Sequence, residues 1–269
     1  MIFPQDIDAL VLDMDGVLWR GEEALPGMAK FFTAARARGL PCALATNNSA
    51  RSPASYVGKL AKMGVADFPS THILTSGTVT LAHLREHFPA ATALHVLGGD
   101  GLREILSAAG FRLVEREAAA VVVGLDRHVS YRKLTNAMRC LQEGAAFIAT
   151  NQDSSYPTPE GLAPGAGSLV AALAYASGRP PTNIGKPAAP LFQAALAVLG
   201  TRAARTLMIG DRLETDILGA ADIGMPTALV MTGVTSTDRL RESSLQPDFV
   251  YAGLPELADA LFSRNSVST

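Results

Sequence analysis

Short apolar runs alternate along the chain with segments of helical periodicity, and this alternation constrains the fold more than any other feature. Residues 7–12 and 40–45 have the length and composition of buried strands, whereas residues 53–63 have the spacing of a helix. Alternating strands and helices are typical of α/β proteins. Residues 151–167 are rich in Pro, Gly and Ser and are predicted to form a long loop.

The composition excludes several classes of function. The 269 residues, 48% of them hydrophobic, are enough for one large or two modest domains with a sizeable core. A net charge of −2 without a basic block argues against nucleic acid as a partner. No apolar run has the length of a membrane span, and the first six residues do not resemble a signal peptide. Cys42 and Cys140 lie far apart, so we expect a cytoplasmic protein with reduced thiols.

Two carboxylates follow the first apolar run. Asp13 and Asp15 stand two residues apart, directly before Gly16. Carboxylates held close together at a strand end are costly without a cation, and ligands bind at strand ends in open α/β sheets. The spacing suggests one carboxylate that attacks or binds a metal ion and a neighbour that handles protons. A solvated acidic turn explains this segment alone equally well, whereas the apolar residues that follow disfavour a calcium-binding EF-hand.

Two further motifs contain groups that can bind phosphate. Thr46 and Asn47 follow the second apolar run, where hydroxyl and amide groups can bind an oxyanion. The ordinary N-cap of a helix is the favoured alternative for this motif alone. Lys186 stands between a glycine and a proline that opens a helix, and a lysine there can meet a phosphate as a point charge. A surface lysine is its alternative reading.

A fourth motif repeats the arrangement of the first. The apolar run 207–209 ends in Gly210 and Asp211, and Asp216 follows five residues later at the start of a helix predicted over residues 215–223. Simple capping at a helix start would also place an aspartate at position 216. Asp211 has no such routine structural explanation, and it suits a hard cation that prefers oxygen ligands, namely Mg²⁺.

These four motifs, in this order, resemble those of the haloacid dehalogenase superfamily of aspartate-nucleophile phosphotransferases. Residues 16–21, 46–49, 164–168 and 185–187 further resemble the large-cap, NagD-like subfamily of nitrophenyl phosphatases and nucleotide phosphatases. The resemblance covers nearly the whole chain. It implies an α/β fold with a Rossmann-like parallel-sheet core, residues 1–77 and 183–269, and an inserted α/β cap, residues 78–182, that selects the substrate.

The same resemblance implies Mg²⁺-dependent hydrolysis of phosphomonoesters through an aspartyl-phosphate intermediate. The implied roles are Asp13 as nucleophile, Asp15 as proton donor and acceptor, Thr46, Asn47 and Lys186 as phosphate ligands, and Asp13, the Asp15 backbone carbonyl and Asp211 as metal ligands, supported by Asp216. An acid at the position of Asp15 favours phosphate esters over haloacids, because only the former release an alkoxide that needs a proton.

The choice of substrate falls to the cap. The resemblance makes Asn151 and Asp153 candidate substrate contacts, although Gln152 stands where related sequences usually have proline. Residues 126–128 also follow an apolar run, and a solvated charged turn is slightly preferred for them over a substrate contact. We expect a small phosphate ester: a nucleoside monophosphate, a sugar phosphate or phosphoglycolate, with p-nitrophenyl phosphate as an artificial substrate.

Two other functions are considered on the same scaffold. A non-catalytic sensor of phosphate ligands is disfavoured, because a sensor need not retain both Asp13 and Asp15. A phosphomutase is disfavoured by the large inserted segment. A homodimer formed through the cap is left open, since the sequence contains no clear interface.

Overall fold

The computed structural model describes residues 7–158 and 160–263, so the expectation for the first six residues lies outside it. The chain divides into two compact units. The first comprises Met1–Thr46, Pro53–Leu74 and Phe192–Thr269, and the second comprises Asn47–Ser52 and Thr75–Leu191. The border predicted after residue 77 lies three residues beyond the division after Leu74, whereas the border predicted after residue 182 lies nine residues before the division after Leu191. Residues 47–52 and 183–191, which the sequence assigns to the core, therefore belong to the second unit.

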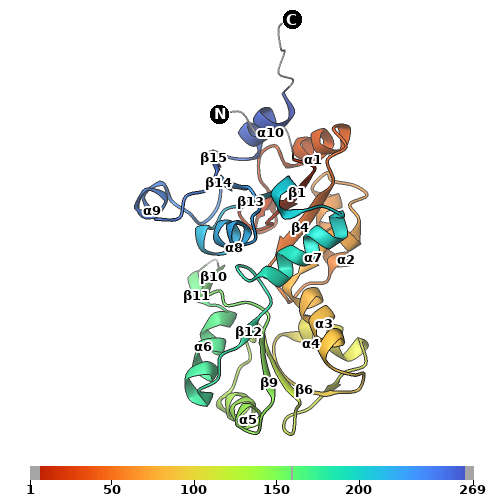
Figure 1. Cartoon of the computed structure of the whole chain (residues 1–269), viewed down its shortest axis with the longest axis vertical. Coiled ribbons are helices and arrows are strands. Elements are labelled where there is room, and N and C mark those ends of the chain that lie inside the picture. The colour runs from red at the N-terminus through yellow and green to blue at the C-terminus, as the bar shows by residue number, and fades with distance from the viewer. Residues whose placement is uncertain (1–6, 159, 264–269) are drawn as a thin grey trace, which may run out of the picture. The chain divides into compact units, whose positions relative to one another are not determined.

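The first unit is built on a six-stranded sheet with the order β15-β14-β13-β1-β4-β5 (Figure 1). The pairs β1–β13, β1–β4, β13–β14 and β14–β15 are parallel. The chain adds strands first on one side of β1 and later on the other, so the strand order reverses beside β1. The predicted α/β class with a parallel-sheet core is confirmed. The strands are β1 (Ala9–Leu12), β4 (Cys42–Thr46), β5 (Ile73–Thr75), β13 (Thr206–Gly210), β14 (Thr227–Val230) and β15 (Phe249–Tyr251).

The central strands of this sheet are buried along their whole length, which explains their unbroken apolar sequence. Helix α1 (Met28–Ala37) packs against α10 (Leu254–Phe262), with the rings of Phe31 and Phe262 5.3 Å apart. The other elements are the ribbon β2 (Trp19–Arg20) and β3 (Glu23–Ala24), the helices α2 (Pro53–Lys62), α8 (Leu218–Asp222) and α9 (Thr237–Glu242), and α7 (Ala189–Leu199), which crosses the border between the units.

The segment predicted as one helix over residues 215–223 has a different structure. A π-helical turn, Leu213–Ile217, precedes the short helix α8. The Asp216 carboxylate accepts hydrogen bonds from the backbone N–H groups of Asp211 and Arg212, both at 3.1 Å. The widened turn thus satisfies amides at the start of the segment and holds Asp216 close to the end of β13.

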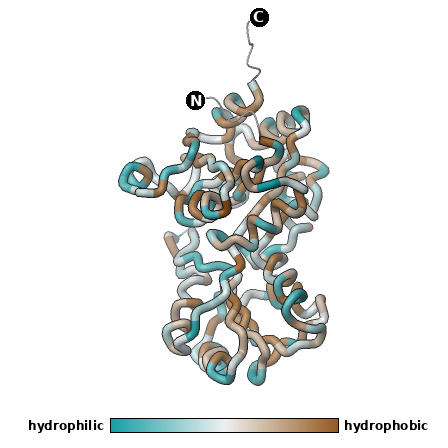
Figure 2. Tube along the Cα trace, in the orientation of Figure 1, coloured by the Kyte–Doolittle hydropathy of each residue, from teal (hydrophilic) through white to brown (hydrophobic). Residues whose placement is uncertain are grey.

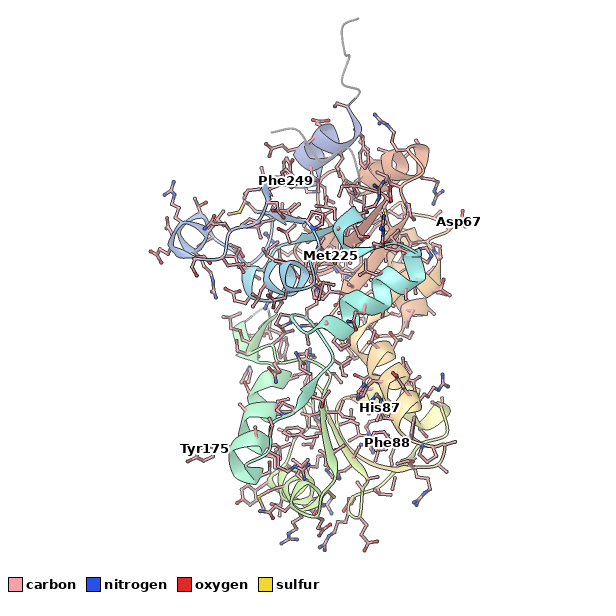
Figure 3. The ribbon with its side chains drawn as sticks, viewed as in Figure 1. Asp67, His87, Phe88, Tyr175, Met225 and Phe249 are labelled. Carbon is pink, nitrogen blue, oxygen red and sulfur yellow. The ribbon has the colours of Figure 1, made fainter. Side chains whose placement is uncertain are left out.

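The second unit has a five-stranded parallel sheet with the order β12-β9-β8-β6-β7. Helices α5 (Tyr131–Gln142) and α6 (Ala166–Ser177) pack on it over an apolar core, and Figure 2 shows hydrophobic residues through its central strands. Tyr175 of α6 points away from this core and is 95% exposed (Figure 3). The remaining elements are α3 (Ser76–His87), β6 (Ala93–Leu97), α4 (Asp100–Ala108), β7 (Arg112–Leu113), β8 (Ala120–Val123), β9 (Ala146–Ala149) and β12 (Thr182–Asn183).

The predicted loop over residues 151–167 contains an antiparallel hairpin, so that prediction is wrong in part. Strands β10 (Ser155–Thr158) and β11 (Gly161–Pro164) pair with each other, and the Thr158 hydroxyl donates to the Gly161 carbonyl at 2.8 Å. Leu162 is exposed, and the two strand sequences contain Pro157 and Pro164, which are typical of loops, so the sequence does not indicate strands here. Within the described residues, no helix is both long and apolar enough to cross a membrane.

Candidate active site

Asp13 lies at the carboxyl end of the central strand of the first sheet. It directly follows β1, and its backbone N–H donates to the Ile209 carbonyl of β13 at 2.9 Å. The residue is buried. Thr46, also buried, ends the neighbouring strand β4 at the same edge of the sheet. Both residues therefore lie where the strand order reverses, which is where open α/β sheets bind ligands.

Asp211 and Asp216 lie at the end of the adjacent strand β13. Asp211 follows Gly210, the last residue of that strand, and its Oδ2 accepts the Val234 N–H at 2.7 Å. Gly210 allows the π-helical turn to fold back, because a Cβ atom there would lie 2.2 Å from the Asp216 Cβ. Backbone amides thus orient both carboxylates.

The carboxylates of Asp13, Asp211 and Asp216 converge. One oxygen atom from each lies within 4.8 Å of the other two, and all three residues are buried. Three buried anions this close repel one another, and a cation between them removes that cost. Carboxylate oxygens are the ligands that hard divalent cations prefer. The donor set therefore fits a divalent metal ion.

Two glycines leave space beside the Asp211 carboxylate. A Cβ atom added at Gly16, which has a φ of +88°, would lie 2.5 Å from Asp211 Oδ2. At Gly233 the corresponding distance is 1.8 Å. A larger residue at either position would displace the carboxylate, so the backbone forms a close-fitting cradle around this group. This cradle also supports a metal site.

Asp15 is in a different environment. Its side chain is exposed and does not belong to the cluster of three carboxylates found among the described residues. Its Oδ1 accepts a hydrogen bond from the indole N–H of Trp19 at 3.0 Å. An exposed carboxyl group can exchange protons with water and with a substrate, as an acid–base group must.

Asn47 and Lys186 are joined within the second unit. Asn47 Nδ2 donates to the Lys186 carbonyl at 2.9 Å, and the Lys186 N–H donates to Asn47 Oδ1 at 2.8 Å. Lys186 is 2% exposed and Asn47 is 9% exposed. Gly185 is needed for this contact, because a Cβ atom there would lie 2.6 Å from Asn47 Oδ1. The second and third motifs of the sequence thus meet through an amide side chain.

The candidate cap residues Asn151 and Asp153 contact Asn47. Asn151 Nδ2 donates to the Asn47 carbonyl at 2.8 Å, and Asp153 Oδ1 accepts from Asn47 Nδ2 at 3.0 Å. The hydroxyl of Ser76 also donates to the Asn47 carbonyl, at 2.7 Å. Sequence reasoning missed Ser76, which has no local signal because its partner is 29 residues away. All three residues therefore stabilise the position of Asn47.

The charged segment after β8 is partly buried, unlike the solvated turn preferred from sequence. Asp126 is 5% exposed, and its carboxylate pairs with Lys133 Nζ at 2.8 Å. It also accepts the backbone N–H of His128 at 2.8 Å. Arg127 lies over the ring of Tyr156, 5.2 Å from its centroid. The Asp126 side chain thus connects the backbone of His128 with the side chain of Lys133.

Comparison with known proteins defines the class. The profile described as haloacid dehalogenase-like hydrolase matches residues 10–112, and one described as HAD-hydrolase-like matches residues 183–257. The chain is 35% identical to the 5'-nucleotidase YutF of Bacillus subtilis over 91% of this chain and 95% of that protein. It is 36% identical to the human glycerol-3-phosphate phosphatase over 95% of this chain and 91% of that protein.

Comparison with solved structures indicates the same class of protein as comparison of sequences. The p-nitrophenyl phosphatase from Archaeoglobus fulgidus aligns with a TM-score of 0.89 and 30% identity, covering 95% of this chain and 99% of that one. NagD from E. coli K-12 aligns with a TM-score of 0.84 and 31% identity, covering 94% of this chain and 98% of that one.

The chain belongs to the haloacid dehalogenase-like hydrolase family. Within it, the chain is a phosphatase of the NagD-like group, as the sequence motifs predict. The alternative of a non-catalytic sensor is therefore set aside.

Proposed function

We propose that this phosphatase is a Mg²⁺-dependent phosphomonoesterase that works through an aspartyl-phosphate. The observation that carries the proposal is the convergence of Asp13, Asp211 and Asp216 at the carboxyl edge of the first sheet. Asp13 and Asp211, with the Asp15 backbone carbonyl and with support from Asp216, would hold Mg²⁺. When bound, the ion would offset repulsion between the carboxylates and a phosphate dianion and stabilise charge on the transferring group.

The chain's own residues carry the two chemical steps. In the first, an Asp13 carboxylate oxygen forms a bond to phosphorus while the bond to the leaving oxygen breaks. The Asp15 carboxyl gives its proton to that leaving oxygen. In the second, Asp15 takes a proton from water, the water oxygen bonds to phosphorus, and the bond from Asp13 to phosphorus breaks. Inorganic phosphate, the Asp13 carboxylate and the protonated Asp15 carboxyl group result.

Three other residues are proposed to bind the phosphoryl oxygens: the Thr46 hydroxyl, the Asn47 backbone N–H and Lys186. Donors fixed in advance stabilise developing charge most effectively, because they need no reorganisation during the reaction. The burial of all three residues and the paired hydrogen bonds between Asn47 and Lys186 support this role.

The proposed substrates are small phosphate esters, namely nucleoside monophosphates, sugar phosphates or phosphoglycolate. The names of the relatives, a 5'-nucleotidase and a glycerol-3-phosphate phosphatase, support this range. The second unit, as an inserted cap, is proposed to choose among them, with Asn151 and Asp153 as its candidate residues.

Hydrolysis of p-nitrophenyl phosphate tests the proposal. We expect turnover with Mg²⁺, loss of turnover with EDTA, and recovery when Mg²⁺ is added in excess. A panel of phosphate esters, compared by kcat/KM, then identifies the preferred class. Turnover that persists unchanged in EDTA would contradict the metal dependence.

A further inference from the structure

Trp19 combines complete burial with a hydrogen bond to an exposed catalytic candidate. The residue is 0% exposed, yet its indole N–H reaches Asp15 Oδ1 at 3.0 Å. The intervening turn makes this contact local. The Gly16 N–H donates to the Trp19 carbonyl at 2.8 Å, and the Leu18 N–H donates to the Met14 carbonyl at 2.8 Å. This turn therefore places the indole of Trp19 beside the side chain of Asp15.

Helix α2 holds the indole ring in one orientation. The ring of Tyr56 stacks on Trp19, with the centroids 6.1 Å apart and the planes 13° apart. Lys59 Nζ lies 4.4 Å from the centroid of the same indole. This cation also donates to the Gly21 carbonyl at 2.6 Å and lies 3.5 Å from a carboxylate oxygen of Glu22. Because both Tyr56 and Lys59 contact the ring, the direction of its N–H is fixed.

We propose that Trp19 is a positioning residue that orients the carboxyl group of Asp15 for proton transfer. This inference rests on the proposed function, in which Asp15 is the acid and then the base. The indole N–H can only donate, so the oxygen that it contacts, Oδ1, is the poorer place for a proton. The proton of the acid form therefore resides on Oδ2, from which it passes to the leaving oxygen as the bond from that oxygen to phosphorus breaks.

Without the indole N–H, the proton can occupy either oxygen and the carboxyl group can rotate. Only part of the acid form would then present its proton to the leaving group. The loss should depend on the leaving group, since an alkoxide needs the proton and p-nitrophenolate leaves readily without it. A residue that merely stabilised the fold would lower both rates alike.

The chain contains a single tryptophan, which allows a one-atom test. Biosynthetic replacement of tryptophan by β-(benzothiophen-3-yl)alanine puts sulfur in place of the N–H and keeps the shape of the ring. The Mg²⁺-loaded enzyme is then compared with the unlabelled enzyme on glycerol phosphate and p-nitrophenyl phosphate. We expect kcat/KM to fall about tenfold for glycerol phosphate, and less than about threefold for p-nitrophenyl phosphate.

Three variants keep the result interpretable. Trp19→Phe removes the N–H by mutation and should reproduce the dependence on the leaving group. Phe31→Leu changes another buried aromatic residue of the same unit and should lower Tm without that dependence. Asp15→Asn tests the underlying mechanism, and it should lose hydrolysis of glycerol phosphate whatever the role of Trp19.

Two results would overturn the role of Trp19. An equal loss for both substrates in the sulfur analogue would make Trp19 only structural, and no loss for either would make its N–H unimportant. If Asp15→Asn instead kept the wild-type rate on glycerol phosphate, the proposed function itself would fail. The two failures are thus separable.

Discussion

The side chain of Asn47 and the backbone of Lys186 are joined by two hydrogen bonds of opposite direction. One runs from Asn47 Nδ2 to the Lys186 carbonyl at 2.9 Å, and the other from the Lys186 N–H to Asn47 Oδ1 at 2.8 Å. A primary amide has both the donor and the acceptor that this pairing needs, whereas a carboxylate has only acceptors. The pairing connects residues 139 positions apart in the chain.

Asn47→Asp is therefore expected to disrupt this connection. The new carboxylate cannot donate to the Lys186 carbonyl, and it faces the Asp153 carboxylate, which Asn47 Nδ2 contacts at 3.0 Å. We expect the free energy of unfolding to fall by about 2 kcal/mol or more, as for a buried polar group that loses its partner. Urea unfolding measures this loss, and kcat/KM for p-nitrophenyl phosphate should fall with it.

Asn48→Asp is the matched control for this change. Asn48 is exposed, and its Oδ1 accepts the Ala50 N–H at 2.9 Å, which a carboxylate oxygen can also do. Its free energy of unfolding should change by less than about 0.5 kcal/mol. Equal destabilisation by the two variants would show that the pairing of Asn47 with Lys186 contributes nothing specific.

Asp13→Asn is expected to abolish turnover while the fold stays intact. An amide oxygen cannot serve as the nucleophile, so kcat for p-nitrophenyl phosphate should fall by about 10⁴-fold or more. Circular dichroism should match the wild type. Asp222→Asn, at an exposed position of α8, should keep full activity. A near-native rate in Asp13→Asn with Mg²⁺ present would refute the covalent mechanism.

Mg²⁺ should stabilise the folded enzyme through the three converging carboxylates. A ligand that binds only the folded state at 100 times its Kd adds about 2.7 kcal/mol to the free energy of unfolding. We expect added Mg²⁺ to raise Tm, and EDTA to reverse the rise. Asp211→Asn should reduce the shift, because it removes one buried anionic ligand, whereas the exposed Asp238→Asn should not. Equal Mg²⁺-induced shifts in both variants would place the ion elsewhere.

Particular residues show what the sequence could predict. Asp13 and Asp211 follow apolar runs that end in turn-forming residues, and in the structure they follow β1 and β13. This signal is local, and so it can be read from one segment. The partners of Trp19 and Asn47 could not be predicted in the same way. Tyr56 lies in helix α2 whereas Trp19 lies in strand β2, and Lys186 lies 139 residues from Asn47, so these contacts depend on tertiary packing.

The π-helical turn and the hairpin were not predicted from the sequence either, for a different reason. Leu213 and Glu214 are good helix formers, and the carboxylate of Asp216, which accepts from two backbone amides, distinguishes the wider turn. The hairpin of β10 and β11 contains prolines and an exposed leucine, which are typical of loops. In both cases the local pattern is compatible with two backbone structures.

Gly233→Ala should inactivate the enzyme although the substitution adds a single methyl group. The added Cβ would lie 1.8 Å from Asp211 Oδ2, so the carboxylate must move away from Asp13 and Asp216. We expect kcat/KM with Mg²⁺ to fall by at least about 100-fold, in line with the sensitivity of such sites to small displacements.

Gly58→Ala is the control, because nothing lies within 4 Å of its Cβ position in α2. This control should retain activity and gain about 1 kcal/mol of stability. Full activity in Gly233→Ala would mean that the position of Asp211 is unimportant.

Cys42 should make the enzyme less stable in alkaline solution. Burial raises the pKa of its thiol from an ordinary value of 9.0 to about 12. The folded state therefore keeps the proton that the unfolded state loses, so this contribution to stability is complete below pH 9 and is lost between about pH 9 and 12. Urea unfolding across this range should show a smaller fall in the free energy of unfolding with rising pH in Cys42→Ala than in the wild type.

Thiol labelling gives a second measurement. At pH 8 the folded wild type should resist thiol reagents, and both of its cysteines should react only after unfolding. Rapid labelling of Cys42 in the folded enzyme, or identical alkaline slopes in the two proteins, would contradict the raised pKa.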